Sequence, residues 1–407
     1  MLKRFLLEKV GITGKDFFTV FFLLFNAFTW WYATLVMMDD LAKRDLVIWT
    51  IYYVALIGSG LIGSVLSYKV QRINFLYVWI FLGTATSSLP AILGSVATHA
   101  VWIVSLLWGL SFGLGIPSCI SYFADCTQIE NRGRVGGSIY LTIILSLPFF
   151  VALFGMANLM VNSMISVVWR GFGLILFFLL KPKEKIDVKK RKNPSFVSIF
   201  HDRSFILYVI PWVMFCLVNR LEEPILRNFF EADFYTFMIM TESILGSLFA
   251  FIGGVLSDFI GRKRMIIYGF VTLGLAYAFI GIAPDMRISW YFYSIIDGIA
   301  WGIFMVIFVL VLWGDLSSFA VREKYYIIGS IPFLLTDLIQ LFLTPYAELI
   351  PSSAAFSLAS LFLFVAVLPL MYAPETLPEK KIELRKLRKY AEKAKKVKEK
   401  FVERTED

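Results

Sequence analysis

The sequence is poor in charged residues, histidine and cysteine. Lys, Arg, Asp and Glu make up 17% of its 407 residues, whereas 58% are hydrophobic. Soluble domains carry about 25% charged residues. Too few charges remain to solvate a globular surface, which excludes an ordinary soluble enzyme, a disordered chain and a nucleic-acid-binding module. Three cysteines and two histidines support neither a disulfide framework nor a metal site.

Motifs for cofactor chemistry are also missing. The chain has no P-loop, no histidine–glutamate metal motif and no serine elbow. Residues 58–63 match the dinucleotide fingerprint, but they lie inside an apolar run with no strand before it, so we discard the match. We therefore expect no enzyme and no cofactor.

Long apolar runs are what the sequence offers instead. Each run is long enough for a membrane-spanning helix and too continuous for a barrel strand. The sequence thus predicts an all-α membrane protein with 12 transmembrane helices. The expected helices cover residues 16–38, 46–68, 75–96, 100–124, 136–157, 159–180, 204–226, 234–258, 265–283, 290–314, 325–350 and 354–372.

Lys and Arg are distributed unevenly among the gaps between these runs. The termini and even-numbered gaps hold most of the 39 basic residues, whereas the odd-numbered gaps hold only Lys43, Arg44, Arg227 and Arg287, with Arg220 nearby. Positive charge stays on the cytoplasmic side. We therefore expect both termini in the cytoplasm and the protein in the cell membrane. The first run follows no cleavage site and is expected to remain in the mature protein.

Polar stretches divide the chain into parts. We expect a cytoplasmic lead-in at 1–15, a six-helix bundle at 16–180, a basic cytoplasmic linker at 181–203, a second six-helix bundle at 204–373 and a basic, helical cytoplasmic tail at 374–407. Apolar residues at helical spacing in the tail fit a helix on anionic lipid or against a partner, or simply a solvated helix. We expect a monomer.

The two halves share an internal repeat. A shift of 190 residues superimposes Gly63 on Gly253, Arg72 on Arg262, Asp125 on Asp315 and Arg132 on Arg322. Several charged positions in one unbroken register indicate a duplication. Two parallel six-helix halves are the organisation of secondary transporters that rock around a central site.

One copy of the repeat resembles the signature loop of the major facilitator superfamily. This copy, residues 253–264, matches the loop at Gly254, Leu256, Asp258, Gly261, Arg262, Lys263 and Arg264. The other copy has Tyr68 in place of the aspartate and Gln71 in place of the last glycine. Residues 125–133 resemble the acidic–RG element after helix four, and residues 373–378 resemble the PET segment of sugar porters. The resemblance implies two pseudo-symmetric bundles, a lipid bilayer and a small-molecule substrate.

Charged residues in these loops are candidates for a cytoplasmic gate. The resemblance implies that charge networks lock the outward-facing state, one of Arg72, Asp125 and Arg132 and one of Arg262, Asp315 and Arg322. Asp258 is expected to cap the helix of the eleventh run, because a carboxylate satisfies exposed N–H groups at a helix start. The alternative is topogenic charge in solvated loops.

Ionisable residues inside the runs are candidates for substrate binding or coupling, because each costs at least ~2.5–3.5 kcal/mol at the bilayer centre. They are Arg170, Glu222, Glu223, Glu242, Asp297 and Asp337. The carboxylates either carry protons, bind a cationic substrate or pair with arginines. Asp337 and Asp297 are the first choices for coupling, because they are deepest and have no basic neighbour in the sequence. The other pair, Glu222 and Glu223, is expected at the membrane interface.

The first half offers fewer such groups. Arg170 either reaches outward to the membrane surface or pairs with a carboxylate or an anionic substrate. Asn26 and the aromatic cluster at 30–32 are candidates for lining the cavity, although the two tryptophans are expected by default to anchor at the lipid interface. The first run has no carboxylate between Asp16 and Asp39, unlike many proton-coupled sugar and drug carriers. Coupling, where present, is therefore expected from the second half.

These observations predict a secondary active transporter that moves a small organic solute by alternating access, as a proton-coupled symporter. Efflux of lipophilic or cationic compounds is the main alternative, suggested by the 17% aromatic content and the acidic interior. A nontransporting membrane receptor or an intramembrane enzyme is the alternative from another class. The sequence does not name the substrate.

Overall fold

The computed structural model describes residues 12–43, 45–67, 69–93, 98–184, 195–347 and 349–378, and these are helical throughout apart from short loops. The elements are α1 (Gly14–Ala42), α2 (Leu46–Leu66), α3 (Arg72–Ser87), α4 (Leu89–Leu93), α5 (Thr98–Cys126), α6 (Arg132–Gly155), α7 (Leu159–Leu180), α8 (Phe196–Phe200), α9 (Arg203–Phe229), α10 (Ala232–Ile260), α11 (Arg262–Ile282), α12 (Arg287–Phe304), the π-helix η3 (Met305–Val311), α13 (Leu312–Leu316), α14 (Arg322–Ala347), α15 (Ser352–Val365) and α16 (Val367–Tyr372). Most of the expected lead-in, linker and tail lies outside the described residues.

Twelve stretches of helix in the described part are long and apolar enough to span a membrane, which confirms the predicted fold class. Three of them combine shorter elements: α3 with α4, α12 with η3 and α13, and α15 with α16. Six spans begin at an arginine that the apolar pattern alone left outside: Arg72, Arg132, Arg203, Arg262, Arg287 and Arg322. The first turn of each is therefore polar, and hydrophobicity alone places its start a few residues late.

Several helix starts are closed by a side chain that accepts a hydrogen bond from the first turn. The side chain of Asp45 accepts from the N–H of Val47 at 2.8 Å, and that of Asn158 accepts from the N–H of Val161 at 2.9 Å. Such caps satisfy N–H groups that have no partner within the helix. The sequence therefore marks where α2 and α7 begin.

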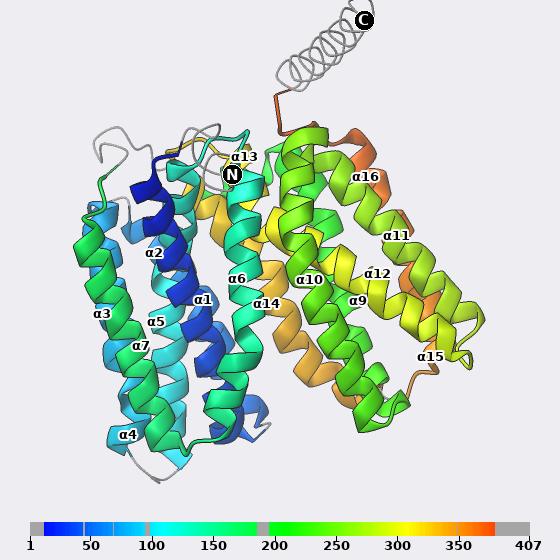
Figure 1. Cartoon of the computed structure of the whole chain (residues 1–407), viewed down its shortest axis with the longest axis horizontal. Helices are drawn as coiled ribbons and strands as arrows, with labels where there is room; N and C mark the ends of the chain where they lie inside the picture. Colours follow the sequence, from blue (N-terminus) through cyan, green and yellow to red (C-terminus); the bar gives the residue numbers. More distant parts are fainter. Residues whose placement is uncertain are drawn as a thin grey trace, which may run out of the picture.

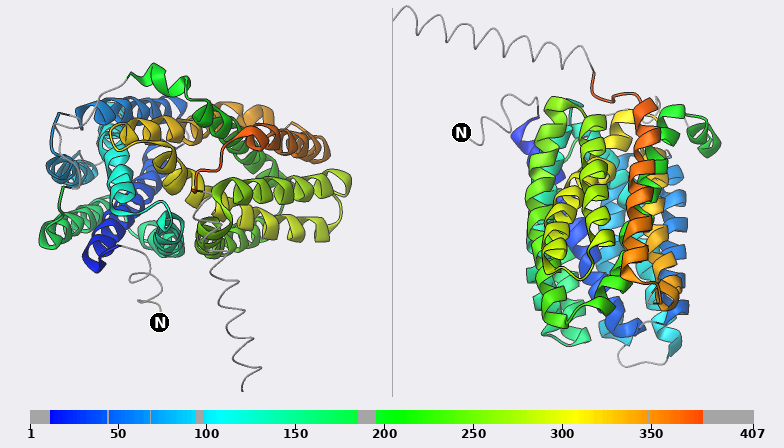
Figure 2. Two further views of the ribbon diagram at one scale, coloured as in Figure 1. Left: turned by 90° about the horizontal axis from the view of Figure 1, so that it is seen from above. Right: turned by 90° about the vertical axis from the view of Figure 1, so that its right-hand side faces the viewer.

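The helices form two groups that lie side by side, α1–α7 and α9–α16 (Figure 1). We call them the first and second half. Both described chain ends lie at the same end of the bundle (Figures 1 and 2). We call it the linker end, and the opposite end the far end. The predicted domain boundaries remain a prediction.

The halves contact each other chiefly where α6 meets α10 and α2 meets α14, and also where α5 meets α14 and α6 meets η3. At the linker end the contact between α6 and α10 depends on glycine. A Cβ atom on Gly133 would collide with the carbonyl oxygen of Gly254, and one on Gly254 would collide with the carbonyl oxygen of Gly133. Small residues of this kind let helix backbones approach closely in lipid.

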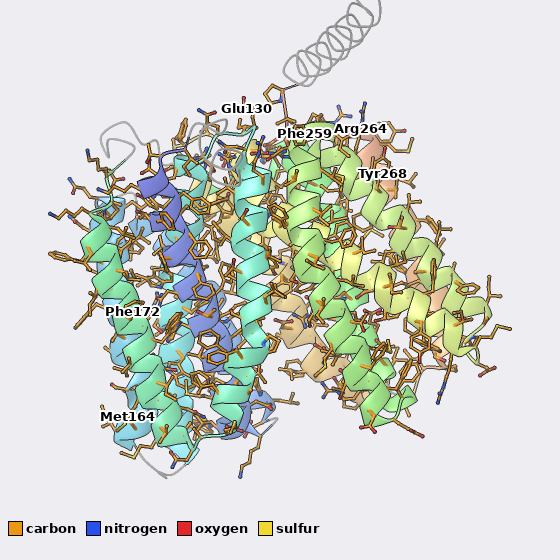
Figure 3. All side chains as sticks on the ribbon, in the orientation of Figure 1. Glu130, Met164, Phe172, Phe259, Arg264 and Tyr268 are labelled. Atoms are coloured by element: carbon orange, nitrogen blue, oxygen red, sulfur yellow. The ribbon has the colours of Figure 1, made fainter. Side chains whose placement is uncertain are left out.

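Apolar side chains cover the outside of both halves. Met164 and Phe172 on α7, and Tyr268 on α11, point away from the bundle on opposite sides (Figure 3). Each of the three side chains is about half exposed. An apolar periphery of this kind matches a hydrocarbon surrounding. The polar and aromatic residues described below lie in the interior, where they contact one another.

Candidate substrate cavity and gate

A cluster of charged residues closes the linker end between the two halves. Its members are Arg72, Asp125, Arg132, Arg134, Asp258, Arg262, Asp315, Arg322 and Glu323, and we call it the linker-end charge cluster. No side chain in it is more than 8% exposed. Buried charges are tolerated when each has a partner, so the cluster holds together only as a complete set.

Four of its ion pairs cross from one half to the other, two of them through the repeated arginines Arg132 and Arg322. Arg132 of the first half pairs with Asp315 of the second, and Arg322 of the second half pairs with Asp125 of the first. The expectation that each of these arginines joins a network within its own half is therefore wrong. Arg132 begins α6 and Arg322 begins α14, and both helices pack across the boundary between the halves.

The sequence interpretation missed Glu323. This carboxylate, at the start of α14, accepts a hydrogen bond of 2.9 Å from Nε of Arg72 and forms an ion pair with the same guanidinium. In the second half, Arg262 lies 2.8 Å from Asp258 of its own loop. Tyr68 occupies the equivalent of Asp258 in the first half. Glu323 thus supplies from the opposite half the carboxylate that the first-half loop lacks, and its only signal in the sequence is its place beside Arg322.

Asp258 caps α6 rather than the helix of the eleventh run. Its two carboxylate oxygens accept hydrogen bonds from the N–H groups of Gly133 (3.0 Å) and Arg134 (2.8 Å). The expected cap on α14 is therefore wrong. The reason is the close contact between Gly133 and Gly254, which brings the last turns of α10 against the first turn of α6.

Gly261 makes the turn between α10 and α11. Its φ angle of 107° lies in the region that favours glycine, whereas Gln71, the equivalent in the first half, has φ −58°. Glu375, in the PET-like segment, accepts hydrogen bonds from the N–H groups of Arg262 (2.8 Å) and Lys263 (3.2 Å). Gly261 therefore permits the turn. The segment after the last span, through Glu375, caps the start of α11.

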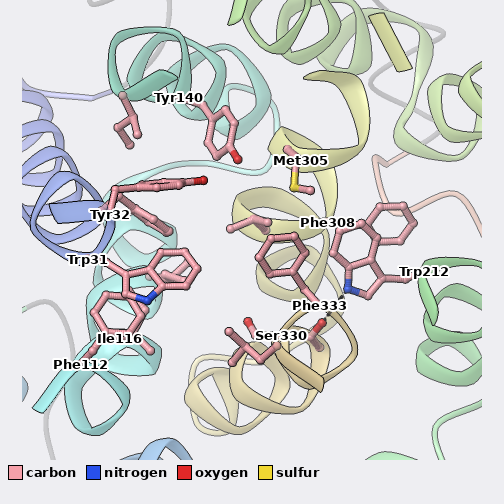
Figure 4. Close-up of a pocket in the computed structure, with 16 residues that line it drawn as sticks. Trp31, Tyr32, Phe112, Ile116, Tyr140, Trp212, Met305, Phe308, Ser330 and Phe333 are labelled. Carbon is pink, nitrogen blue, oxygen red and sulfur yellow. Dashed lines mark hydrogen bonds between the residues drawn. The ribbon is translucent and has the colours of Figure 1, made fainter. Parts of the chain in front are cut away.

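An aromatic cavity lies between the two halves, in the interior of the bundle (Figure 4). Helices α1, α5 and α6 line one side with Trp31, Tyr32, Phe112 and Tyr140, among others. Helix α9, η3 and α14 line the other side. Met305 and Phe308 belong to η3, and π-helical turns are frequent at functional sites. We call this space the inner aromatic cavity.

A second, larger space adjoins it at Tyr32, which lines both. This space has a volume of about 300 Å³ and is lined by α1, α6, α9, α10 and α12. Its ionisable residues are Arg220, Glu222, Glu223, Glu242 and Asp297, and it also contains Tyr235 near the far end. We call it the acidic cavity. It combines four of the five predicted intramembrane carboxylates, which are brought together from three helices.

Three of these carboxylates have no basic partner among the described residues. They are Glu222, Glu242 and Asp297. One oxygen of Glu242 and one of Asp297 are buried without a hydrogen bond. Helices α10 and α12 approach closely here, since a Cβ on Gly298 would lie 3.0 Å from Cα of Glu242. Nowhere in the described ranges are three or more metal-binding side chains arranged to hold an ion. The group can accept protons or a cation.

Asp337 is paired, which corrects the expectation that it lacks a basic neighbour. Its Oδ1 lies 2.6 Å from Nε of Arg220 on α9. Glu223 also faces Arg220, at 3.9 Å, and accepts a hydrogen bond of 2.8 Å from Arg227. The partner of Asp337 comes from a different helix, which spacing within α14 does not indicate. Asp297 remains without a basic partner among the described residues, in agreement with the sequence interpretation.

Glu222 is buried, with 7% of its surface exposed, and its expected place at the membrane interface stays a prediction. Tyr277 donates a hydrogen bond to its Oε2, and Asn219 donates one of 3.2 Å to Oε1. Glu223 is one third exposed at the rim of the same cavity. The adjacent pair therefore divides into one buried and one partly exposed carboxylate.

Arg170 does not reach the surface, and no carboxylate of the described residues pairs with it, so these two expectations are wrong. Pairing with an anionic substrate stays a prediction. The Arg170 side chain is fully buried between the rings of Trp30 and Trp79, with its guanidinium carbon 4.7 Å and 4.4 Å from their centroids. Asn26 accepts a hydrogen bond of 2.7 Å from it. Stacking on two aromatic faces offsets part of the cost of burying this cation.

Asn26 joins α1 to α7 instead of lining the central cavities. Besides binding Arg170, it donates a hydrogen bond of 2.8 Å to the carbonyl oxygen of Trp169. The two tryptophans of the first span are buried and are not interface anchors: Trp30 donates to Ser87, and Trp31 lines the inner aromatic cavity. Their N–H groups find partners inside the first half, which makes burial possible.

Neither a protein-family model nor a curated protein sequence matches the chain. Solved structures do. The human organic anion transporter MFSD10 (TETRAN) aligns with a TM-score of 0.68 at 14% identity, covering 88% of this chain and 99% of that one. The proton:xylose symporter XylE, bound to 6-bromo-6-deoxy-D-glucose, aligns with a TM-score of 0.66 at 14% identity, covering 89% and 96%. The E. coli fucose:proton symporter FucP aligns with a TM-score of 0.69 at 12% identity, covering 88% and 98%.

The fold is that of the major facilitator superfamily. Within this fold the 190-residue repeat has a simple structural meaning. Arg72 and Arg262 begin α3 and α11, and Arg132 and Arg322 begin α6 and α14. The repeated arginines therefore occupy equivalent helix starts in the two halves of the major facilitator fold, and all of them meet at the linker end.

Proposed function

We propose that the protein is a secondary active transporter of the cell membrane that moves a small organic solute by alternating access, coupled to protons as a symporter. The observation that carries this proposal is the acidic cavity between the halves. Glu222, Glu242 and Asp297 line it without a basic partner among the described residues. Three carboxylates that line one cavity without a basic partner repel one another, so proton uptake there is favoured.

The linker end faces the cytoplasm in this proposal. Basic residues concentrate at the termini and even-numbered gaps, which supports that orientation. The linker-end charge cluster is buried, whereas the rim of the acidic cavity includes Glu223, which is 34% exposed, and Ile239, which is 43% exposed. The described state is then closed toward the cytoplasm and accessible from outside. Breaking the ion pairs that join the halves opens the other side.

Efflux of a lipophilic or cationic compound is the second candidate. The inner aromatic cavity favours it, because aromatic faces attract cations and bury apolar groups. Tyr32 lines both this cavity and the acidic one. A molecule with an apolar body and a positive charge would find a suitable surface for each part.

Proteoliposomes that enclose a pH-sensitive dye separate these candidates. A panel of sugars, organic acids, amino acids and organic cations is first screened by thermal shift, and the solutes that stabilise the protein are then added outside the vesicles. Symport acidifies the lumen as the solute enters, whereas antiport makes it alkaline. Glu242→Gln and Asp297→Asn are expected to reduce this proton flux at least tenfold, while solute exchange without net proton movement continues.

Asp285→Asn is the matched control, because this acid is exposed in the loop between α11 and α12. It should leave the proton flux unchanged. Solute-driven proton flux at wild-type rate in both cavity variants would remove the coupling assignment. Solutes that stabilise the protein but never cross the membrane would instead support a receptor.

A further inference from the structure

A third cavity opens on the side of the second half, away from the boundary between the halves. It lies among α9, α11, α14 and α15 and has a volume of about 410 Å³. At its mouth are Tyr346, Leu358 and Phe362, which are 69%, 57% and 46% exposed. These residues belong to helices long and apolar enough to span a membrane. The mouth therefore faces hydrocarbon, and we call this space the membrane-facing crevice.

Its inner wall is apolar with one exception. Phe356 and Ile225 are buried there, and the alanines Ala355 and Ala359 leave room along α15. The exception is Glu222, the one charged side chain that lines the crevice. An apolar chain alone would fill the volume and leave this carboxylate without a counter-charge.

Glu222 has unused capacity for a cation. Its hydrogen bonds come from Tyr277 and Asn219, both neutral, and no lysine or arginine of the described ranges pairs with it. A carboxylate offers about four acceptor positions, so two hydrogen bonds leave room for another donor. It is also the residue that lines both the crevice and the acidic cavity. Negative charge from the acidic cavity repels anions from this position and favours a positive group.

We propose that the membrane-facing crevice binds an amphiphilic amine from the bilayer, with the ammonium group at Glu222 and the apolar tail between α14 and α15. A long-chain amine matches both parts of the site: the tail replaces lipid against an apolar wall, and the ammonium donates to a carboxylate that otherwise has only neutral partners. The inference deepens the proposed function by adding a ligand class and a route of access, but it is tested by binding alone.

The test uses the full chain in phosphatidylcholine nanodiscs with radiolabelled dodecylamine as the probe and dodecanol as its neutral analogue. Binding is counted above that of empty nanodiscs. Glu222→Gln should weaken dodecylamine binding at least tenfold and leave dodecanol binding unchanged. Ala359→Phe fills the crevice and should weaken both. Asp285→Asn, in an exposed loop, should change neither. Should Ala359→Phe lower the melting temperature, Ala355→Phe fills the same space from one turn away.

Two results would overturn the inference. Equal binding of dodecanol and dodecylamine to wild type, unaffected by Glu222→Gln, would show a groove for apolar chains only. Full dodecylamine binding in Ala359→Phe, with loss in Glu242→Gln, would place the amine in the acidic cavity. Failure of proton-coupled transport leaves these outcomes untouched, because no step of the binding experiment requires transport.

Discussion

Glu323 of the second half accepts a 2.9 Å hydrogen bond from Arg72 of the first half. Arg72 and Arg262 are equivalent in the internal repeat, yet they obtain their second carboxylate differently. Arg262 uses Asp258 from its own loop, whereas Arg72, whose loop has Tyr68 at that position, uses a residue from across the boundary. The degraded copy of the signature loop is thus compensated in space, and the compensation adds a link between the halves.

Glu323→Gln should loosen the closed linker end. A hydrogen bond to a charged partner contributes about 1.5–3 kcal/mol, so its weakening shifts the equilibrium about tenfold toward a state open at this end. Spin labels at Gln128 and Arg264, on different halves, report the separation in a background without native cysteines. We expect a longer-distance component in Glu323→Gln and none in Asp285→Asn. An unchanged distance distribution would contradict a role in closure.

Gly254→Ala should prevent the halves from closing, because its Cβ would collide with the carbonyl oxygen of Gly133 on the opposite half. Gly253→Ala is the neighbouring control, since a Cβ there meets the side chain of Ile303 within the same half. The same pair of spin labels should show persistent separation only in Gly254→Ala. Identical behaviour of the two variants would mean that general packing, and not closure, is affected.

Asn26→Ala should lower stability by about 1–3 kcal/mol, because it removes the acceptor for the buried Arg170 guanidinium. Asn74→Ala is the control: this side chain is exposed and bonds only to Gln71 among the contacts described. Thermal unfolding in detergent measures both. Ligand affinity should be unchanged in folded Asn26→Ala, because this residue lines neither central cavity. A loss of affinity at full stability would return Asn26 to the candidate binding residues.

Arg220 and Asp337 should be energetically coupled. A double-mutant cycle with Arg220→Gln and Asp337→Asn is expected to give a coupling energy of about 1 kcal/mol or more, since neither side chain is more than 26% exposed. The pair Arg227–Glu223 is 52% and 34% exposed and should give less than ~1 kcal/mol. Equal coupling in both cycles would show that burial does not strengthen the Asp337 pair.

Local sequence patterns predicted the spans well because a membrane helix satisfies its own backbone and needs only apolar side chains over a sufficient length. Where prediction erred, the cause was a partner distant in the chain. Asp337 has no basic neighbour along α14, and Arg220 reaches it from α9. No carboxylate of the described residues pairs with Arg170, and two aromatic rings and Asn26 surround it.

Composition, the length of the apolar runs and the 190-residue repeat determined by themselves that this is a two-part helical membrane protein with repeated charges at its loops. Only the tertiary structure decided which charges meet: Arg132 with Asp315, Arg322 with Asp125, and Asp258 with the start of α6. Hydrophobicity is a property of each segment, so it can be read locally. Ion pairs and caps depend on which helices pack together. Here the contacts of α6 with α10 and of α14 with α5 bring these groups together.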